Sequence, residues 1–210
     1  MILIGVGANL PSPRHGPPRA TCGAALAALA EAELLIAQRS QWYKSAPVPV
    51  SEQPWFVNAV VRVQTTLDPT SLLGLLLKTE ESFGRRRGEL NAPRILDLDL
   101  LAYEEMVTDR EQPNAGGMGA PDVPHPRMHE RPFVLLPLRD VAPCWCHPVS
   151  GMGVEELIQA LPEGLEIEVI ADANGAYGSV WQASDAYGGG KQGYCRCYPD
   201  LSVGARFFRH

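Results

Sequence analysis

The sequence has 210 residues, of which 45% are hydrophobic, and this suits one domain with a buried core. Its 18 basic and 24 acidic residues leave a formal charge of -6, which excludes a general nucleic-acid binder and confines any phosphate site to a local basic cluster. The opening MILIGVGANL lacks a basic leader, and no apolar run is long enough to cross a bilayer. We therefore expect a cytoplasmic protein without a membrane or nucleic-acid partner.

The first 65 residues alternate between apolar segments and proline-rich loops. MILIGVGANL is interpreted as a buried first strand over Ile2–Val6, followed by a turn at Gly5, Gly7 and Asn9 where the backbone approaches another group closely. The next predicted elements are a loop (Pro11–Pro18), an alanine-rich helix (Thr21–Leu34), a strand (Leu34–Lys44), a second loop (Ser45–Pro54) and a strand (Phe56–Thr65).

The segment Phe56–Thr65 alternates clearly between two faces. Val57, Ala59, Val61 and Val63 form the predicted core face, because successive side chains of a strand point in opposite directions. The other face places Phe56 and Asn58 side by side, an arrangement in which a flat heterocycle can stack on the ring and hydrogen-bond to the amide.

A second helix is predicted between Asp68 and Gly84. Asp68 is a favourable N-cap residue, Pro69 suits the first helical turn, and Gly84 is a natural helix end. Three arginines follow the helix as Arg85, Arg86 and Arg87.

The segment PRILDLDLLAY, residues 93–103, places two aspartates inside an apolar run. In a strand over Ile95–Tyr103, Asp97 and Asp99 share one face while the neighbouring leucines share the other. Two carboxylates at this spacing suit a hard divalent cation such as Mg²⁺. The alternative is an ordinary solvated outer face.

The remaining elements complete an α+β fold. We expect a glycine-rich insertion near 105–123, helices over Arg131–Val141 and Gly153–Leu161, and a last strand over Leu165–Ile170. The order strand, helix, strand, strand, helix, strand predicts a ferredoxin-like antiparallel sheet with helices packed on one face. Residues 1–170 form the predicted domain, and residues 171–210 a glycine- and aromatic-rich C-terminal extension of unknown role.

Cationic side chains accompany the two aspartates. Arg85, Arg87 and Arg94 lie within twelve positions of Asp97, and guanidinium groups match phosphate oxygens in charge and geometry. Carboxylate-bound metal with arginines is typical of phosphoryl transfer, although a salt-bridged basic loop remains an alternative. A Walker motif is absent from the sequence, so the phosphates must bind to side chains.

A second group of polar residues lies in VPHPRMHERPFVLLPL, residues 123–138. His125 and His129 are four residues apart, but the flanking prolines argue against a helix there and so against a pair of metal ligands. His125 and Arg131 are better candidates for phosphate contacts, and a structural role for either histidine stays open.

The sequence resembles the 6-hydroxymethyl-7,8-dihydropterin pyrophosphokinase family of folate biosynthesis. The resemblance covers about the first 160 residues, in the family's order. The motifs that carry it are GVGANL at 5–10, WYKSAPV at 42–48, QPWFVNAVV at 53–61, the helix end at 80–87, PRILDLDLL at 93–101 and PHPRMHERPFVLLPL at 124–138.

The resemblance implies an ATP-dependent enzyme that transfers a pyrophosphoryl group to the hydroxymethyl group of the pterin and releases AMP. Asp97 and Asp99 would hold two Mg²⁺ ions, with Arg85 and Arg94 as the other catalytic residues. The ATP-binding positions implied are Glu80, Arg87, Leu98, His125 and Arg131. The pterin-binding positions implied are Ser45, Ala46, Val48, Phe56, Asn58 and Phe133. The partners would be these two small molecules, and the protein a monomer or weak homodimer.

The sequence also departs from the family. Asn91 stands near the place where many relatives carry a tryptophan, Ala8 replaces the usual serine, and the insertion at 108–122 is longer. Two rival functions remain open, namely a regulatory module that binds nucleotide or metal without catalysis, and a Mg²⁺-dependent nucleotidyltransferase or phosphohydrolase.

The sequence has five cysteines, which is an odd number, and it shows no export signal. We therefore predict reduced thiols instead of disulfides. As an alternative, the two C-x-C pairs could supply four thiolates to a structural zinc ion. These pairs are Cys144 with Cys146 and Cys195 with Cys197.

Overall fold

The computed structural model describes residues 1–32, 34–85, 93–108, 120–164 and 166–170. No helix within these ranges is both long and apolar enough to span a membrane. The described elements are the strands β1 (Ile2–Ala8), β2 (Leu35–Arg39), β3 (Trp42–Ser45), β4 (Phe56–Gln64), β5 (Asp97–Tyr103) and β6 (Ile167–Ile170), the helices α1 (Pro18–Glu31), α2 (Pro69–Ser82), α3 (Pro132–Val141) and α4 (Val154–Gln159), and a 3-10 turn (Met128–Glu130).

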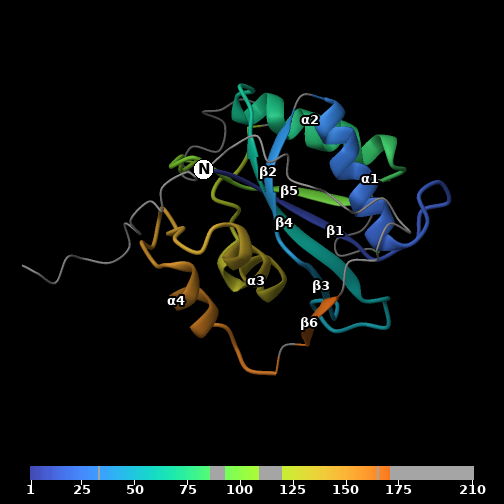
Figure 1. Ribbon diagram of the computed structural model, residues 1–210. Helices are drawn as coiled ribbons and strands as arrows, with labels where there is room; N and C mark the ends of the chain where they lie inside the picture. The colour runs from blue at the N-terminus through green and yellow to red at the C-terminus, as the bar shows by residue number, and fades with distance from the viewer. Residues whose placement is uncertain (33, 86–92, 109–119, 165, 171–210) are drawn as a thin grey trace, which may run out of the picture.

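The strands form one antiparallel sheet that lies between two layers of helix (Figure 1). The strand order is β5-β1-β4-β3-β6, and β2 pairs with the far end of β4. Helices α1 and α2 cover one face, and α3 and α4 lie on the other (Figure 1). The α+β class is confirmed, but the expectation of helices on one face is wrong, because both faces of the sheet carry apolar residues.

The core under α1 and α2 follows from strand alternation. On each of the adjacent strands β5, β1 and β4, every second residue is apolar and points toward these helices, and together they form one buried cluster. The strand members of this cluster are Ile2, Ile4, Val6 and Ala8 of β1, Ala59, Val61 and Val63 of β4, and Leu98 and Leu100 of β5.

The opposite face carries a second, smaller core under α3. Leu3 of β1, Val60 of β4 and Leu101 of β5 pack with Leu135 and Leu138 of the helix. This cluster occupies only part of the face, and the remainder is left to polar residues and glycine.

The predicted strand Leu34–Lys44 is divided into β2 and β3 by a bulge at Ser40. Arg39 pairs with Val61 of β4, and Tyr43 pairs with Asn58 of the same strand. Arg39 and Tyr43 are four positions apart while their partners are three apart, so the β2–β3 segment has one more residue than β4 here. The Ser40 hydroxyl accepts a hydrogen bond from Val60 N at 3.0 Å, replacing the main-chain bond that the bulge removes.

Other boundaries differ by a few residues. Helix α1 begins at Pro18 instead of Thr21, because proline is well tolerated in the first helical turn. Strand β1 continues to Ala8, so Gly5 and Gly7 lie within the strand and not in the predicted turn. Helix α3 continues through Pro137, as expected.

Helix α2 begins and ends where the sequence predicts. The Asp68 carboxylate accepts hydrogen bonds from Thr70 N at 3.0 Å and Ser71 N at 3.1 Å, which satisfies two of the free amides of the first turn. At the other end Gly84 has a φ of 89°, a conformation that favours glycine.

We predict that Asp68→Ala lowers the free energy of unfolding by about 1 kcal/mol, because the first-turn amides lose their acceptor. Chemical denaturation would measure this loss. Asp68→Asn is the matched control and should retain most of the stability, since asparagine is also a good N-cap residue. Equal stability of the alanine variant and the unmodified protein would contradict the prediction.

Candidate functional site

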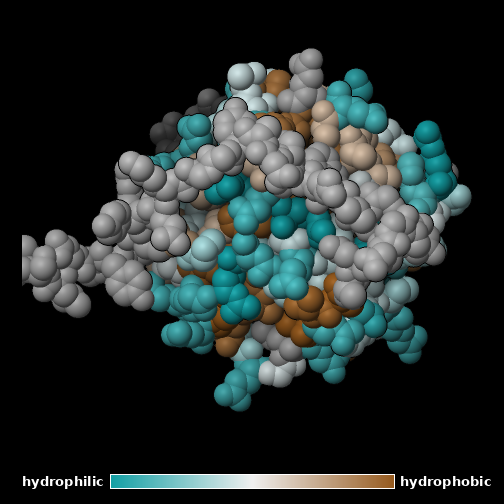
Figure 2. Space-filling view, viewed as in Figure 1, coloured by the Kyte–Doolittle hydropathy of each residue, from teal (hydrophilic) through white to brown (hydrophobic). Residues whose placement is uncertain are grey.

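A cavity of about 370 Å³ opens on the face of the sheet that carries α3, beyond the N-terminal end of that helix. On the face seen in Figure 2, the described hydrophobic residues appear in separate patches among hydrophilic ones. The cavity is lined by residues of β1, β4 and β5, by the loop between β3 and β4, and by the segments around Arg94, His125 and Arg131. Four stretches of the chain, within 5–7, 45–60, 85–101 and 125–134, therefore meet at one site.

The floor of the cavity is the backbone of β1 at two glycines. Gly7 is paired with Asn58 of β4 on one side and with Asp97 of β5 on the other. A Cβ atom at this position would lie 3.2 Å from the Asn58 Oδ1 atom, so a larger residue would displace the amide. Gly5 likewise lies between Val60 and Asp99. The missing side chains leave the space between the polar residues of the neighbouring strands open.

Asp97 and Asp99 lie on the cavity side of β5, as the alternation predicts. Their side chains are partly buried, with exposed fractions of 19% and 35%. Arg94 hydrogen-bonds to Asp97, the Arg85 guanidinium lies 3.1 Å from the Asp97 Oδ1 atom, and that of Arg131 lies 3.8 Å from the Asp99 Oδ2 atom. The solvated-face alternative is therefore wrong, because these carboxylates line a cavity among cations.

The carboxylate pair is not fully satisfied by the protein. Burial raises the pKa of Asp99, and the neighbouring charge of Asp97 raises it further. Oδ1 of Asp97 is buried and makes no hydrogen bond, although it is ion-paired with Arg85. Among the described residues no cluster of three or more histidine, cysteine or acidic ligands is present. A cation bound here would take its other ligands from water or substrate, as Mg²⁺ commonly does.

Glu80 and Leu98 support the aspartate strand from the side away from the cavity. Glu80 is 1% exposed, accepts a hydrogen bond from Leu98 N at 2.6 Å and is ion-paired with Arg85. Burial raises the pKa of Glu80 to about 7, against the opposing effects of these two partners. Neither residue is part of the cavity lining, so ATP contact by Glu80 or Leu98 stays a prediction.

The other end of the cavity is aromatic and neutral. Phe56 and Phe133 both line it, one from β4 and one from the first turn of α3. Asn58 donates a hydrogen bond from Nδ2 to the buried Ser45 hydroxyl at 2.9 Å, which fixes its amide in the wall of the same cavity. The predicted positions Ala46 and Val48 line the same end.

His125 and Arg131 complete the wall between the two ends. Burial and the charge of Arg131 lower the pKa of His125 to about 4, so its ring is neutral at pH 7. The His125 Nδ1 atom accepts a hydrogen bond from Arg127 N at 3.2 Å, which places the ring proton on Nε2. Arg131 lies over the Phe133 ring at 5.6 Å.

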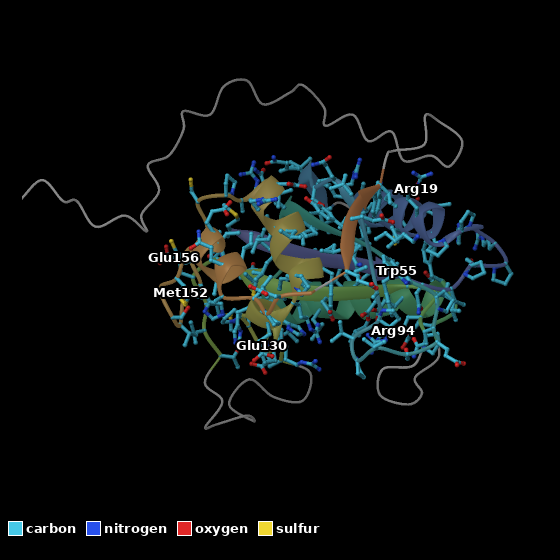
Figure 3. The ribbon with its side chains drawn as sticks, turned by 90° about the horizontal axis from the view of Figure 1, so that it is seen from below. Arg19, Trp55, Arg94, Glu130, Met152 and Glu156 are labelled. Carbon is cyan, nitrogen blue, oxygen red and sulfur yellow. The ribbon has the colours of Figure 1, made fainter. Side chains whose placement is uncertain are left out.

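Sequence reasoning missed several residues of the site. Gln53 lines the cavity, and the two β1 glycines form its floor. The glycines carried a usable signal, because they alternate with apolar core residues in LIGVG and so share one strand face. Figure 3 shows Arg94 and Trp55 toward the same end of the sheet, away from Met152 and Glu156. Arg87, Asn91 and most of the insertion at 108–122 lie outside the described residues.

The cysteines differ from the expectation. Cys144 and Cys146 each take part in a disulfide bond, so the prediction of reduced thiols is wrong for these two. Cys22 is a free, buried thiol, and burial raises its pKa. Cys195 and Cys197 lie outside the described residues.

Comparison with known proteins gives a consistent result. Residues 3–143 match the family model of 7,8-dihydro-6-hydroxymethylpterin-pyrophosphokinase (HPPK). The chain is 36% identical over 158 residues to the 2-amino-4-hydroxy-6-hydroxymethyldihydropteridine pyrophosphokinase of Synechocystis, covering 75% of this chain and 74% of that protein. It is 37% identical over 166 residues to the protein of the same name from Pseudomonas aeruginosa, covering 79% and 94%.

Longer relatives match over part of their length. The chain is 34% identical over 140 residues to a folic acid synthesis protein of Dictyostelium discoideum, covering 67% of this chain and 20% of that protein. The wild-type HPPK-DHPS structure of Plasmodium falciparum superposes with a TM-score of 0.53 over 75% of this chain and 44% of that chain, and at 15% identity it supports the fold alone. The family match and the two relatives that align over most of their own length show that this chain belongs to the HPPK family.

Proposed function

We propose that this chain transfers the terminal pyrophosphoryl group of ATP to the hydroxymethyl oxygen of 6-hydroxymethyl-7,8-dihydropterin, a step of folate biosynthesis. A bond forms between that oxygen and the β-phosphorus, the bond from the β-phosphorus to the bridging oxygen of AMP breaks, and the hydroxyl proton is released. The observation that carries the proposal is a single cavity lined both by charged residues and by aromatic and amide groups.

Asp97 and Asp99 fit a Mg²⁺ site. They supply carboxylate oxygens from one strand face, and the buried Oδ1 atom of Asp97 has no hydrogen bond. We propose two Mg²⁺ ions at this pair, and when bound these ions would supply positive charge to the ATP phosphates. Because both aspartates lie on β5, they would hold the ions at a fixed position in the cavity.

Three arginines neutralise the phosphates from around the aspartates. Arg85 and Arg94 are paired with Asp97, and Arg131 lies near Asp99. The forked guanidinium groups of these arginines suit phosphate oxygens in both charge and geometry, so they would bind the phosphates of ATP beside the aspartates. His125, which is neutral, offers its Nε2 proton as a hydrogen-bond donor. Arg87 is proposed as a further phosphate contact from the family resemblance.

The neutral end suits a pterin. Phe56 and Phe133 offer two aromatic faces for a flat heterocycle, and Asn58 offers amide atoms to its edge. Ser45 holds the amide in place, and Ala46 and Val48 line the pocket beside it. With the rings and the aspartates in one cavity, the hydroxymethyl group would lie next to the phosphates, and such proximity accounts for much of the rate of group transfer.

The wider organisation is proposed from the same reasoning. We assign the pyrophosphokinase domain to residues 1–170, with residues 171–210 as an extension. A ferredoxin-like core is supported by the strand order β5-β1-β4-β3 with α1 and α2 as its two crossovers. The cytoplasmic location and the monomeric or weakly dimeric state stay predictions from the sequence.

The direct test is to incubate the purified chain with ATP, Mg²⁺ and 6-hydroxymethyl-7,8-dihydropterin and to separate the nucleotides by chromatography. We expect AMP and pterin diphosphate to form in equal amounts, and neither product without the pterin or with Mg²⁺ removed by chelation. Metal-dependent ATP binding without AMP release would favour a regulatory module. Free phosphate as the product would favour a phosphohydrolase.

We predict that Asp97→Asn and Asp99→Asn each lower kcat/KM for AMP formation by roughly a thousandfold or more, because each removes a charged metal ligand from the site. Circular dichroism should show a retained fold. Asp68→Asn is the matched control, since it makes the same substitution at the α2 cap and should leave turnover unchanged. Near-normal turnover in both site variants would rule out this role for the aspartates.

We predict that Gly7→Ala raises the KM for the pterin by about tenfold, since the new Cβ atom displaces an amide whose hydrogen bonds orient the ring. The KM for ATP should change much less. The control is Gly74→Ala on α2, where a Cβ meets no atom within 4 Å, and it should leave both KM values unchanged. An unchanged pterin KM in Gly7→Ala would contradict a role for Asn58 in pterin binding.

A further inference from the structure

Asn9 is a buried polar residue that follows β1 and belongs to none of the groups described above. It is 1% exposed and is not part of the cavity lining. A buried amide normally makes hydrogen bonds that offset its loss of hydration. The amide of Asn9 makes three, and they run to two segments of the chain that both contribute residues to the cavity lining.

The first segment is the one that precedes the aspartate strand. The Asn9 Oδ1 atom accepts a hydrogen bond from Arg94 N at 2.7 Å, and Asn9 N donates to Arg94 O at 3.0 Å. Asn9 therefore holds both main-chain polar groups of Arg94. The guanidinium group of Arg94 is paired with Asp97. Because Asn9 holds the Arg94 main chain, it also limits where this guanidinium group can lie.

The second segment is the loop between β3 and β4. The Asn9 Nδ2 atom donates to Gln53 Oε1 at 3.3 Å and to Pro54 O at 3.2 Å. Three of the ten loop residues at 46–55 are prolines without an N–H group, which limits the main-chain hydrogen bonds that the loop can donate. Gln53 lines the cavity, and the loop leads directly into Phe56.

We propose that Asn9 is a positioning residue that fixes the pterin end of the site relative to the phosphate end. The proposal rests on the proposed function and adds a residue to it. Asn9 acts through Gln53, Pro54 and Arg94 and does not itself contact substrate. Arg94, which Asn9 bonds, and Trp55, which follows the bonded Pro54, are labelled at the same end of the molecule in Figure 3. One side chain thus links segments 85 and 45 residues away from it.

Two variants separate the two halves of this link. Asn9→Asp keeps an acceptor for Arg94 N but loses the Nδ2 donor. Gln53 can turn its amide and donate to the new carboxylate, whereas Pro54 O is only an acceptor and loses its hydrogen bond. Asn9→Ala loses the side-chain bonds to both segments and keeps only the main-chain bond from residue 9 N to Arg94 O. The control is Tyr103→Phe, which removes a 2.7 Å hydrogen bond from the Tyr103 hydroxyl to Leu67 O at the opposite end of β5, outside the cavity lining.

Hydrogen exchange of the protein without substrates tests the link independently of catalysis. In Asn9→Asp we expect faster exchange of the amides at 50–55 and retained protection of the Arg94 amide. In Asn9→Ala we expect both regions to exchange faster. Tyr103→Phe should leave both regions unchanged. Exchange in Asn9→Ala that matches the unmodified protein in both regions would overturn the proposal.

Steady-state kinetics test the consequence for catalysis. We expect Asn9→Asp to raise the KM for the pterin by about tenfold while the KM for ATP changes by less than about twofold. Asn9→Ala should raise both KM values and lower kcat, whereas Tyr103→Phe should change none of them. Kinetics in Asn9→Ala equal to those of Tyr103→Phe would overturn the positioning role. If the unmodified protein forms no AMP, the proposed function fails, and the exchange experiment still decides whether Asn9 joins the two segments.

Discussion

The pairing of β1 with β4 on one side and with β5 on the other is the constraint on which the site depends. Through it, Gly7 lies between Asn58 and Asp97, and the two ends of the cavity are separated by the width of a single strand. The spacing between neighbouring strands is nearly invariant, so the distance between the amide and the carboxylates is set by main-chain hydrogen bonds. The loops then need only to complete the walls.

The same three strands hold the site in place by burying their other face. Apolar residues alternate with the cavity residues and pack under α1 and α2, so a one-residue slip in register would move the aspartates into the core. The cost of burying unpaired carboxylates opposes any such slip. The same alternation of side chains along these strands therefore determines both the core packing and the geometry of the site.

The electrostatics of the cavity depend on a balance between few charges. Asp97 is paired with two arginines, whereas Asp99 has one more distant arginine and a raised pKa. Behind them, Glu80 is buried with one oxygen bonded to Leu98 N and the other without a hydrogen bond. This arrangement keeps negative charge concentrated at the edge strand of the sheet, where a metal ion and a polyphosphate can reach it.

The sequence by itself determined the features that are encoded within a few neighbouring residues. The cap, proline and terminal glycine of α2 and the alternation at Phe56, Asn58, Asp97 and Asp99 were all predictable, because caps and strand periodicity act locally. Only the tertiary structure decided that helices cover both faces, that Ser40 is a bulge, that Glu80 lies behind the cavity, that Cys144 and Cys146 are disulfide-bonded, and that Asn9 joins Arg94 to the β3–β4 loop. These features depend on contacts between residues far apart in the chain. Local propensity reflects only neighbouring residues, so it carries no information about contacts that form when the sheet assembles.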